Sequence, residues 1–311
     1  WTFYTVPAPG EFGSDTWPAD SAAWETGGGT VWHTPAVDPE LGMIYFSTGN
    51  PGPDYNGAIR AGDNLFTASI VALDVYTGEY RWHFQQVHHD LWDFDAPNPV
   101  VLFDLDYEGV PRKGLAQAGK TGWVYILDRT NGEPLVGIEE RPVPQEPRQA
   151  TAATQPYPVG DAFVSQTLDI QPEGFTMVNN GAIFTPFWDN PVLLRRSEAN
   201  WPPSTVDPNK GVMYVCAGER QAAYATRDGV EQVESGDRYT GGSMRFAPIA
   251  VTGVVAAMDL RTNQRLWSQR WSSRCYSGLV ATAGDLLFAG RNDGRFTAMD
   301  SRDGTKLWEF M

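Results

Sequence analysis

Residues 88–95 read His-His-Asp-Leu-Trp-Asp-Phe-Asp and place three carboxylates and two imidazoles within eight positions. Asn50 ends a strand-like run and would expose an amide oxygen in the turn that follows. Carboxylate and amide oxygens suit Ca²⁺ and similar hard cations. Carboxylates grouped around a cation stay ionised, and one of them can accept a proton. These segments therefore predict a cation site with a base, and Lys120 adds an ammonium group further along the chain.

Two other interpretations of this segment stay open. The neighbouring His88 and His89 are a weak zinc signal, because adjacent side chains rarely converge on one ion and no Cys or His partner follows. The aspartates could instead form turns and caps at the ends of strands, which is a common role of this residue type. The residues of this segment alone do not separate a catalytic cluster from turn chemistry.

A run of three glycines, Gly27–Gly29, comes shortly before Trp32. Glycine has no side chain, so the backbone can approach another group closely at this point. The indole of Trp32 would offer a flat aromatic surface beside it. This segment therefore indicates contact with a planar group.

A short pattern of apolar residues, Asp, and a turn with Thr and Gly or Asn recurs at residues 72, 126, 257 and 298. The last two copies are about 40 residues apart, a period typical of β-propeller blades. In this unit Asp accepts hydrogen bonds from backbone amides of the turn. A Trp that often follows would pack between blades. The pattern predicts an all-β fold of the β-propeller type with tryptophan-docking blade motifs, whose repeat residues hold the fold.

Similar aromatic strands close the units at Trp82 and Trp308, and the chain begins with such a strand at Trp1. We therefore expect one partial propeller domain over the whole chain, an incomplete piece of a longer protein. Two segments interrupt the repeats. A Pro-, Gln- and Ala-rich insertion at about 139–169 could be a passive excursion or a lid, and an irregular aromatic segment follows at about 181–209.

The composition favours this fold and excludes some functions. The 32 Gly and 23 Pro favour short strands joined by tight turns. A net charge of −15 repels phosphate backbones, so no nucleic-acid partner is expected. No apolar run reaches the length of about 18 residues that spans a membrane. Cys216 and Cys275 lie in or beside apolar, strand-like stretches and are expected to be buried thiols rather than a disulfide.

Five motifs occur in an order and at spacings similar to those of the PQQ-dependent (quinoprotein) dehydrogenases. The motifs are Gly27–Trp32, Thr48–Pro51, Gly62–Asn64, His89–Asp93 and Leu127–Gly132. This family includes methanol, ethanol and membrane-bound glucose dehydrogenases, built on eight-bladed propellers, and the similarity runs over essentially the whole chain. Residues 87–93, 120–122 and 141–145 most resemble the glucose dehydrogenase branch.

The resemblance implies a role for each matching residue. Trp32 resembles the tryptophan on which PQQ stacks, and Asn50 resembles the amide ligand of the metal. Asp93 resembles the catalytic base and is also expected among the metal ligands. Lys120 resembles the cation that hydrogen-bonds the quinone oxygens, where it would stabilise negative charge as the cofactor is reduced.

Three further positions follow from the same resemblance. Tyr276 falls where many relatives place a second Trp against the cofactor, and Asn200 resembles a residue at the cofactor rim. Asp95 stands where lanthanide enzymes carry an extra acidic metal ligand. Glucose dehydrogenase relatives also carry an acid there, so Ca²⁺ is favoured and a lanthanide stays possible. The family's glutamate metal ligand would lie before residue 1.

The implied function is PQQ-dependent oxidation of a sugar or primary alcohol, with metal-assisted hydride transfer and Asp93 as the general base. Electrons would pass to a membrane quinone or a cytochrome, in the periplasm or at the outer face of the inner membrane. The alternatives are a non-catalytic propeller scaffold of the outer-membrane assembly type and a degenerate protein that binds PQQ without turnover. A scaffold has no reason to keep a base, a metal amide and a lysine at these spacings.

Overall fold

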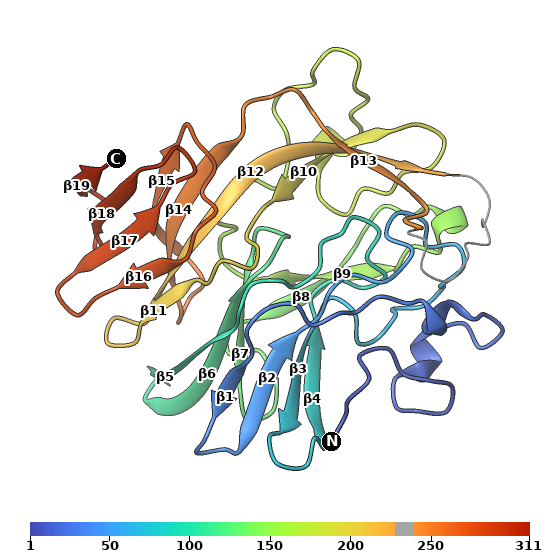
Figure 1. The fold of residues 1–311 in the computed structure, drawn as a ribbon, viewed down its shortest axis with the longest axis horizontal. Coiled ribbons are helices and arrows are strands. Elements are labelled where there is room, and N and C mark those ends of the chain that lie inside the picture. The colour runs from blue at the N-terminus through green and yellow to red at the C-terminus, as the bar shows by residue number, and fades with distance from the viewer. Residues whose placement is uncertain (228–238) are drawn as a thin grey trace.

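The computed structural model describes residues 1–227 and 239–311, and within them antiparallel sheets follow one another in sequence order. Figure 1 shows these sheets along an open arc, with the two ends of the chain far apart. The first two sheets pair in the orders β1-β2-β3-β4 and β5-β6-β7. Their strands are β1 (Ala36–Asp38), β2 (Met43–Ser47), β3 (Ser69–Asp74), β4 (Tyr80–Gln85), β5 (Val101–Tyr107), β6 (Val110–Ala118) and β7 (Val124–Asp128).

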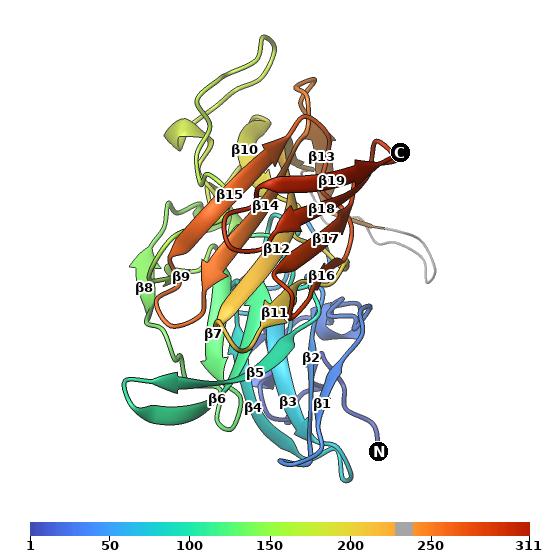
Figure 2. The same cartoon turned by 90° about the vertical axis from the view of Figure 1, so that its left-hand side faces the viewer.

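A hairpin and two larger sheets follow. The hairpin is β8 (Ile138–Pro142) with β9 (Thr154–Pro158). The next sheet has the order β10-β12-β14-β15, with β11 and β13 also paired to β12: β10 (Val192–Ser197), β11 (Thr205–Asp207), β12 (Val212–Thr226), β13 (Gly242–Phe246), β14 (Thr252–Asp259) and β15 (Arg265–Trp271). The last sheet is β16 (Leu279–Ala281), β17 (Leu286–Gly290), β18 (Phe296–Asp300) and β19 (Lys306–Phe310), and it lies beside β12 and β14 in Figure 2.

Helices are short in the described parts of the chain. They are single 3-10 turns: η1 (Ser14–Thr16), η2 (Ala23–Glu25), η3 (Pro147–Gln149) and η4 (Asn179–Gly181). Over residues 1–227 and 239–311, no helix has the length and apolar character needed to cross a membrane.

Apolar cores lie between consecutive sheets. One core joins β2–β4 to β6 and β7, a second joins β5–β7 to β12 and β14, and a third joins β12 and β14 to β16–β18. A fourth core packs the other face of β3 against Phe3 and Phe66, so the inner strands β3 and β14 are both buried on two faces. This explains why their sequences are continuous apolar runs instead of alternating patterns. Sheets stacked in this way are propeller blades, and the predicted all-β propeller-type fold is confirmed.

Tryptophans on the last strands of the sheets connect neighbouring blades. Trp82 on β4 donates from its indole nitrogen to the carbonyl oxygen of Arg129, just after β7, at 3.1 Å. A Cβ atom on Gly132, in the same turn, would lie 2.6 Å from the Trp82 ring, so only glycine fits there. Trp267 on β15 donates in the same way to Ser301 after β18, at 3.1 Å. The predicted packing of these tryptophans between blades is confirmed.

The repeat aspartates form the expected turns. The carboxylate of Asp74 accepts hydrogen bonds from the backbone amides of residues 76 and 77, both at 2.9 Å. Asp259 accepts the amides of residues 261 and 262 at 2.7 and 3.1 Å. These aspartates therefore close the turns and have a structural role, as predicted.

The two interrupting segments contain more regular structure than their composition indicates. Residues 139–169 include most of the β8–β9 hairpin. Residues 181–209 include β10, which pairs with β12 at the edge of a blade and is buried over its whole length because apolar cores cover both of its faces. The apolar run Val192–Leu194 starts this strand, which the proline- and aromatic-rich surroundings hide in the sequence.

Cys216 and Cys275 form a disulfide, so the expectation of two separate thiols is wrong. Both residues are buried, as expected, and their Cα atoms are 5.5 Å apart. Cys216 lies on β12 and Cys275 precedes β16, two elements that are distant in sequence but packed together. Their proximity depends on how blades stack, which cysteine spacing does not reveal.

Candidate active site

The predicted site residues lie on connections at one end of the sheets. Trp32 precedes β1 and Asn50 follows β2, while Asp93 and Asp95 lie between β4 and β5. Lys120 lies in the turn between β6 and β7. Within each antiparallel sheet the start of one strand lies beside the end of the next, so these connections all leave the same end of the blades.

Lys120 is the centre of the site. Its ammonium lies 2.9 Å from Oδ1 of Asp93 and also pairs with Oδ1 of Asp95. Only 4% of the Lys120 side chain and 2% of the Asp95 side chain are exposed. The indole nitrogen of Trp32 donates to Oδ2 of Asp95 at 3.2 Å. The structure therefore brings together four of the predicted residues from three separate connections.

Burial and charge act in opposite directions on these groups. Burial alone would raise the pKa of Asp93, but the positive charges of Lys120 and Arg196 outweigh it and hold that pKa below its ordinary value. Burial raises the pKa of Asp95, with Lys120 opposing the shift. Burial opposes the charged form of Lys120, yet the two carboxylates keep its pKa above the ordinary value. The two cationic neighbours therefore keep Asp93 ionised, while burial favours the protonated form of Asp95.

Arg196 is a site residue that the sequence did not point to. Its guanidinium contacts Oδ2 of Asp93 at 2.6 Å from Nη2, and Nη1 donates to the carbonyl oxygen of Trp92 at 2.8 Å. It is buried on β10. The available signal was the apolar run of residues 192–194 followed by two arginines, which fits a strand leading to a charged site.

Asn50 lies next to the Trp32 loop, and the nitrogen of its side-chain amide is engaged locally. Backbone hydrogen bonds from Gly29 to Asn50 and from Gly49 to Thr30, at 3.0 and 2.9 Å, hold the two connections together. The Asn50 side-chain amide donates to the carbonyl oxygen of Pro51 at 3.1 Å. Its predicted role as a metal ligand stays a prediction.

Asn200 and Tyr276 belong to a second patch. The rings of Trp201 and Tyr276 meet edge to face with centroids 5.8 Å apart, and the guanidinium of Arg274 covers the Tyr276 ring at 3.6 Å. Asn98 donates to the backbone carbonyl of Asn200 at 2.7 Å. Asn98 is three positions after Asp95, so this patch adjoins the Lys120 cluster through the chain.

The other polar residues of the 88–95 segment have different partners. His88 contacts Gln85 and Glu140 at 2.7 and 3.2 Å. His89 is buried and faces the backbone carbonyls of Gly62 and Gln149 at 2.8 and 2.6 Å. The two imidazoles therefore do not converge on one point.

Asp90 has the turn role that was left open for the aspartates of this segment. Its Oδ1 accepts the amide of Trp92 at 2.8 Å. Burial raises the pKa of Asp90 to about 7, against the lowering effect of that hydrogen bond. The segment therefore combines turn chemistry at Asp90 with a charge cluster at Asp93 and Asp95.

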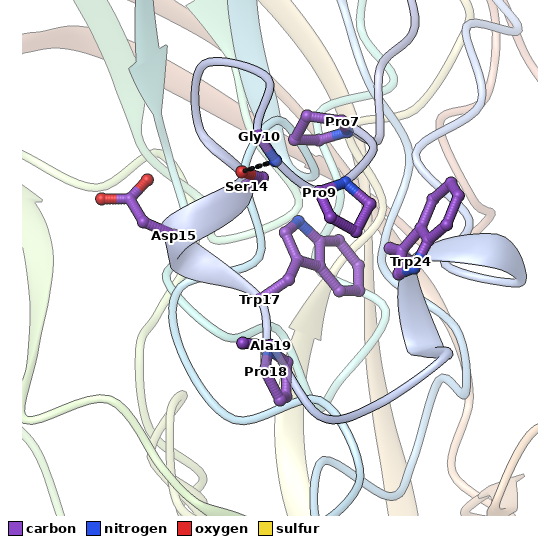
Figure 3. Close-up of a pocket in the computed structure, with 9 residues that line it drawn as sticks. All are labelled: Pro7, Pro9, Gly10, Ser14, Asp15, Trp17, Pro18, Ala19 and Trp24. Atoms are coloured by element: carbon purple, nitrogen blue, oxygen red, sulfur yellow. Dashed lines mark hydrogen bonds between the residues drawn. The ribbon is translucent and has the colours of Figure 1, made fainter.

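Figure 3 shows a hollow of about 480 Å³ elsewhere on the molecule. It is lined by Pro7, Pro9, Gly10, Ser14, Asp15, Trp17, Pro18, Ala19 and Trp24. The ring-bearing side chains that line this hollow are prolines and tryptophans. The hydrogen bond drawn in the figure runs from the backbone amide of Gly10 to the hydroxyl of Ser14, within one turn, at 3.1 Å. The residues of the Lys120 cluster are not part of this hollow.

The donor groups fit a planar, electron-accepting cofactor better than they complete a metal site. Trp32 is 44% exposed, so its indole offers a flat surface directly beside a buried ammonium and two carboxylates. Within the described parts of the chain, no three His, Cys, Asp or Glu side chains group as a metal site. Ca²⁺ takes about six to eight oxygen ligands, so these residues would supply only part of a metal shell.

A propeller-type fold with two carboxylates, a buried ammonium and an open indole at one end of its blades fits the class of quinoprotein dehydrogenases. The family described as glucose/ethanol/alcohol dehydrogenase, beta-propeller domain, matches residues 1–228. This match covers most of the chain, and the chain belongs to this PQQ-dependent family. Residues 208–310 also match the family of the outer membrane protein assembly factor BamB, over blades that carry the repeats.

The similar proteins are longer than this chain. A quinohemoprotein alcohol dehydrogenase, ADH-IIG of Pseudomonas putida, is 32% identical over 99% of this chain and 44% of its own length. A lupanine 17-hydroxylase [cytochrome c] of Pseudomonas sp is 30% identical over 100% of this chain and 44% of its own. A europium-containing methanol dehydrogenase superposes with a TM-score of 0.74 at 26% identity, over 98% of this chain and 50% of its own. The chain thus spans about half the length of the relatives it matches.

Proposed function

We propose that the protein oxidises a primary alcohol with PQQ as the electron acceptor. The observation that carries this proposal is the buried Lys120 ammonium, which holds Asp93 and Asp95 together beside the open indole of Trp32. Membership of the PQQ-dependent family and the alcohol dehydrogenases among the relatives support the same chemistry. A sugar is the alternative substrate, because residues 87–93 resemble the glucose dehydrogenase branch.

When bound, PQQ supplies the two-electron acceptor for the hydride of the substrate carbon. Trp32 would offer the flat surface on which the planar ring stacks, and Lys120 would donate to oxygen atoms that gain negative charge. Asp93 takes the proton from the substrate hydroxyl, for which its low pKa keeps it ionised.

The remaining predicted residues complete the proposed site. Asp93, Asp95 and Asn50 would contribute oxygen ligands to a metal ion, with Ca²⁺ favoured and a lanthanide as the alternative. A europium-containing relative supports the lanthanide alternative. Asn200 and Tyr276 border the cofactor at the edge of the site.

We also propose a location in the periplasm or at the outer face of the inner membrane. The disulfide between Cys216 and Cys275 supports this location, because such bonds persist in oxidising compartments. A cytochrome is the favoured electron acceptor, since one relative carries cytochrome c in its name, and a membrane quinone is the alternative.

Replacing the base tests the function. In the full-length protein loaded with PQQ and Ca²⁺, Asp93→Asn should lower dye-linked alcohol turnover by about 10²–10⁴-fold while PQQ still quenches tryptophan fluorescence. Asp20→Asn, an exposed carboxylate outside the site, is the matched control and should keep full turnover. Unchanged turnover in Asp93→Asn would remove this residue from its role.

The BamB-type match over residues 208–310 favours a second candidate, a non-catalytic scaffold. A scaffold would give no saturable quenching by PQQ and no turnover in the unmodified protein. A degenerate PQQ binder would show quenching without turnover. The same two measurements therefore separate all three functions.

A further inference from the structure

We infer that Arg196 is the residue that positions the Asp93 carboxylate for proton abstraction, an inference that rests on the function proposed above. Arg196 contacts two consecutive residues, Trp92 and Asp93. Its Nη2 contacts Oδ2 of Asp93 at 2.6 Å, and its Nη1 donates to the carbonyl oxygen of Trp92 at 2.8 Å. The guanidinium therefore fixes both the side chain of the base and the peptide that precedes it.

The backbone of Asp93 explains why such a clamp is needed. Asp93 has a φ of 57°, in the left-handed region that non-glycine residues seldom adopt. A residue in this conformation stays there only when its surroundings hold it. Lys120 contacts Oδ1 and Arg196 contacts Oδ2, so the carboxylate is held at both oxygens from opposite partners. Each oxygen keeps a second lone pair with which it can accept a proton.

Arg196 is itself held rigidly. It lies on β10, is buried, and also contacts the hydroxyl oxygen of Tyr224 on β12 at 3.0 Å. Tyr224 is fully buried between Phe187, with ring centroids 5.6 Å apart, and Tyr55, at 5.9 Å. The Arg196 guanidinium is therefore held by two paired strands and by packed aromatic rings around Tyr224. Such rigid surroundings keep a reacting group in a fixed position.

The neighbouring arginine provides a natural comparison. Side chains alternate between the two faces of a strand, so Arg195 points away from Arg196. Arg195 pairs with the buried Glu219 at 2.7 Å and donates to the carbonyl oxygen of Ser165 at 3.1 Å. Both arginines are buried ion-pair partners on the same strand, but only Arg196 touches the base.

The test compares Arg196→Lys with Arg195→Lys in the full-length protein loaded with PQQ and Ca²⁺. Lysine keeps the charge but loses the planar fork, so it cannot hold Asp93 and the Trp92 carbonyl together. Arg196→Lys should lower kcat by about 10–100-fold, with KM and PQQ affinity within about twofold, because a misplaced base slows only the chemical step. Arg195→Lys should leave kcat within about twofold, since its contacts lie on the other face.

Tyr224→Phe is the second variant, in case Arg196→Lys does not fold. It removes one contact to the guanidinium while keeping the ring, and it should lower kcat by about three- to tenfold without changing KM. Unchanged kcat in folded Arg196→Lys would overturn the inference, as would an equal loss of kcat in Arg195→Lys. If Arg196→Lys does not fold, unchanged kcat in Tyr224→Phe would overturn it.

The proposed function is judged separately by Asp93→Asn. Loss of turnover in Asp93→Asn with full turnover in Arg196→Lys would overturn the positioning role alone. Full turnover in Asp93→Asn would overturn the role of Asp93 as the base, whereas no turnover in the unmodified protein would overturn the function on which the inference rests.

Discussion

Two clusters in this molecule combine a buried cation with two carboxylates, but they differ in how completely their groups are satisfied. In the first, Nε of Arg129 contacts Asp38 at 2.7 Å, and Nη1 contacts Asp104 and the carbonyl oxygen of Phe103, both at 2.6 Å. Asp38 also accepts the backbone amides of residues 40 and 41 at 2.9 and 3.0 Å. Asp104 is 65% exposed, but the Arg129–Asp38 pair is buried and closed to solvent, and the cluster joins β1 and β5 to the turn after β7.

The second cluster, around Lys120, stays open on one side. Asp93 keeps 23% of its side chain exposed, and Trp32, which donates to Asp95, is 44% exposed. Asp93 also has a left-handed backbone. Charge and burial are therefore not what distinguish a reactive cluster from a structural one. The distinction is the exposed indole of Trp32 beside the Lys120 cluster, together with a backbone conformation at Asp93 that the surroundings must hold.

The largest expected effect is on stability, at the closed cluster. Arg129→Met leaves Asp38 buried without its cation and should lower the free energy of unfolding by about 3–5 kcal/mol. Arg112→Met is the matched control, because Arg112 is 48% exposed and lies 3.7 Å from Asp128. It should change stability by at most about 1 kcal/mol. Urea titration, monitored by tryptophan fluorescence, measures the free energy of unfolding of both variants. Equal losses would show that the Arg129 cluster stabilises the fold no more than an exposed ion pair does.

The pH dependence of stability tests whether the charge of Asp38 stabilises the Arg129 cluster. Burial would raise the pKa of Asp38, but the hydrogen bonds from Arg129 and from the backbone amides of residues 41 and 40 hold it below the ordinary 3.8. The folded state therefore binds fewer protons than the unfolded state near that pH. The stabilising contribution is complete above about pH 4 and is lost as the pH falls through the lower folded-state pKa.

Asp38→Asn should consequently be less stable than the unmodified protein by about 1.5–3 kcal/mol at pH 7. The difference should shrink toward zero as the pH falls from 7 through the lowered folded-state pKa, where the native carboxyl becomes protonated as well. Urea titrations of both proteins across this range measure the difference. If the difference in the free energy of unfolding between the two proteins stays constant with pH, the charge of Asp38 contributes nothing to the stability of the cluster.

The sequence predicted those features that arise from short stretches of chain. The turn aspartates and the 88–95 cluster each depend on residues a few positions apart, so their types and spacing were sufficient. Lys120 was placed through a resemblance to a family, and the structure brings it to Asp93 and Asp95. The propeller class followed from the repeats.

Features that depend on blade stacking were not predicted. Arg196 reaches Asp93 across 103 positions of sequence, and it does so because β10 lies beside the β4–β5 connection. The disulfide joins cysteines 59 positions apart for the same reason. Neither contact leaves a periodic signal, and β10 itself was hidden in a segment expected to be irregular. Local chemistry was therefore predictable, whereas the partners that orient it were not.

The smallest effect expected on stability from removing a buried cation is at the Lys120 cluster. Removing this cation tests most directly whether the Lys120 and Arg129 clusters differ. Lys120→Met should lower the free energy of unfolding by only about 1–2 kcal/mol, despite the deep burial of this side chain. Asp93 keeps Arg196 as a partner, and Asp95 keeps the indole donor of Trp32. Burial already raises the pKa of Asp95, so protonating this carboxylate in the folded variant costs little free energy.

Lys113→Met is the matched control, a partly exposed lysine that pairs with Glu40 at 2.6 Å, and it should change stability by at most about 1 kcal/mol. Urea titration under the conditions used for Arg129→Met measures both lysine variants. A loss in Lys120→Met as large as that in Arg129→Met would mean that the Lys120 cluster is structural like the Arg129 cluster. A small loss, combined with the disappearance of tryptophan quenching by PQQ, would show that Lys120 serves the bound ligand more than the fold.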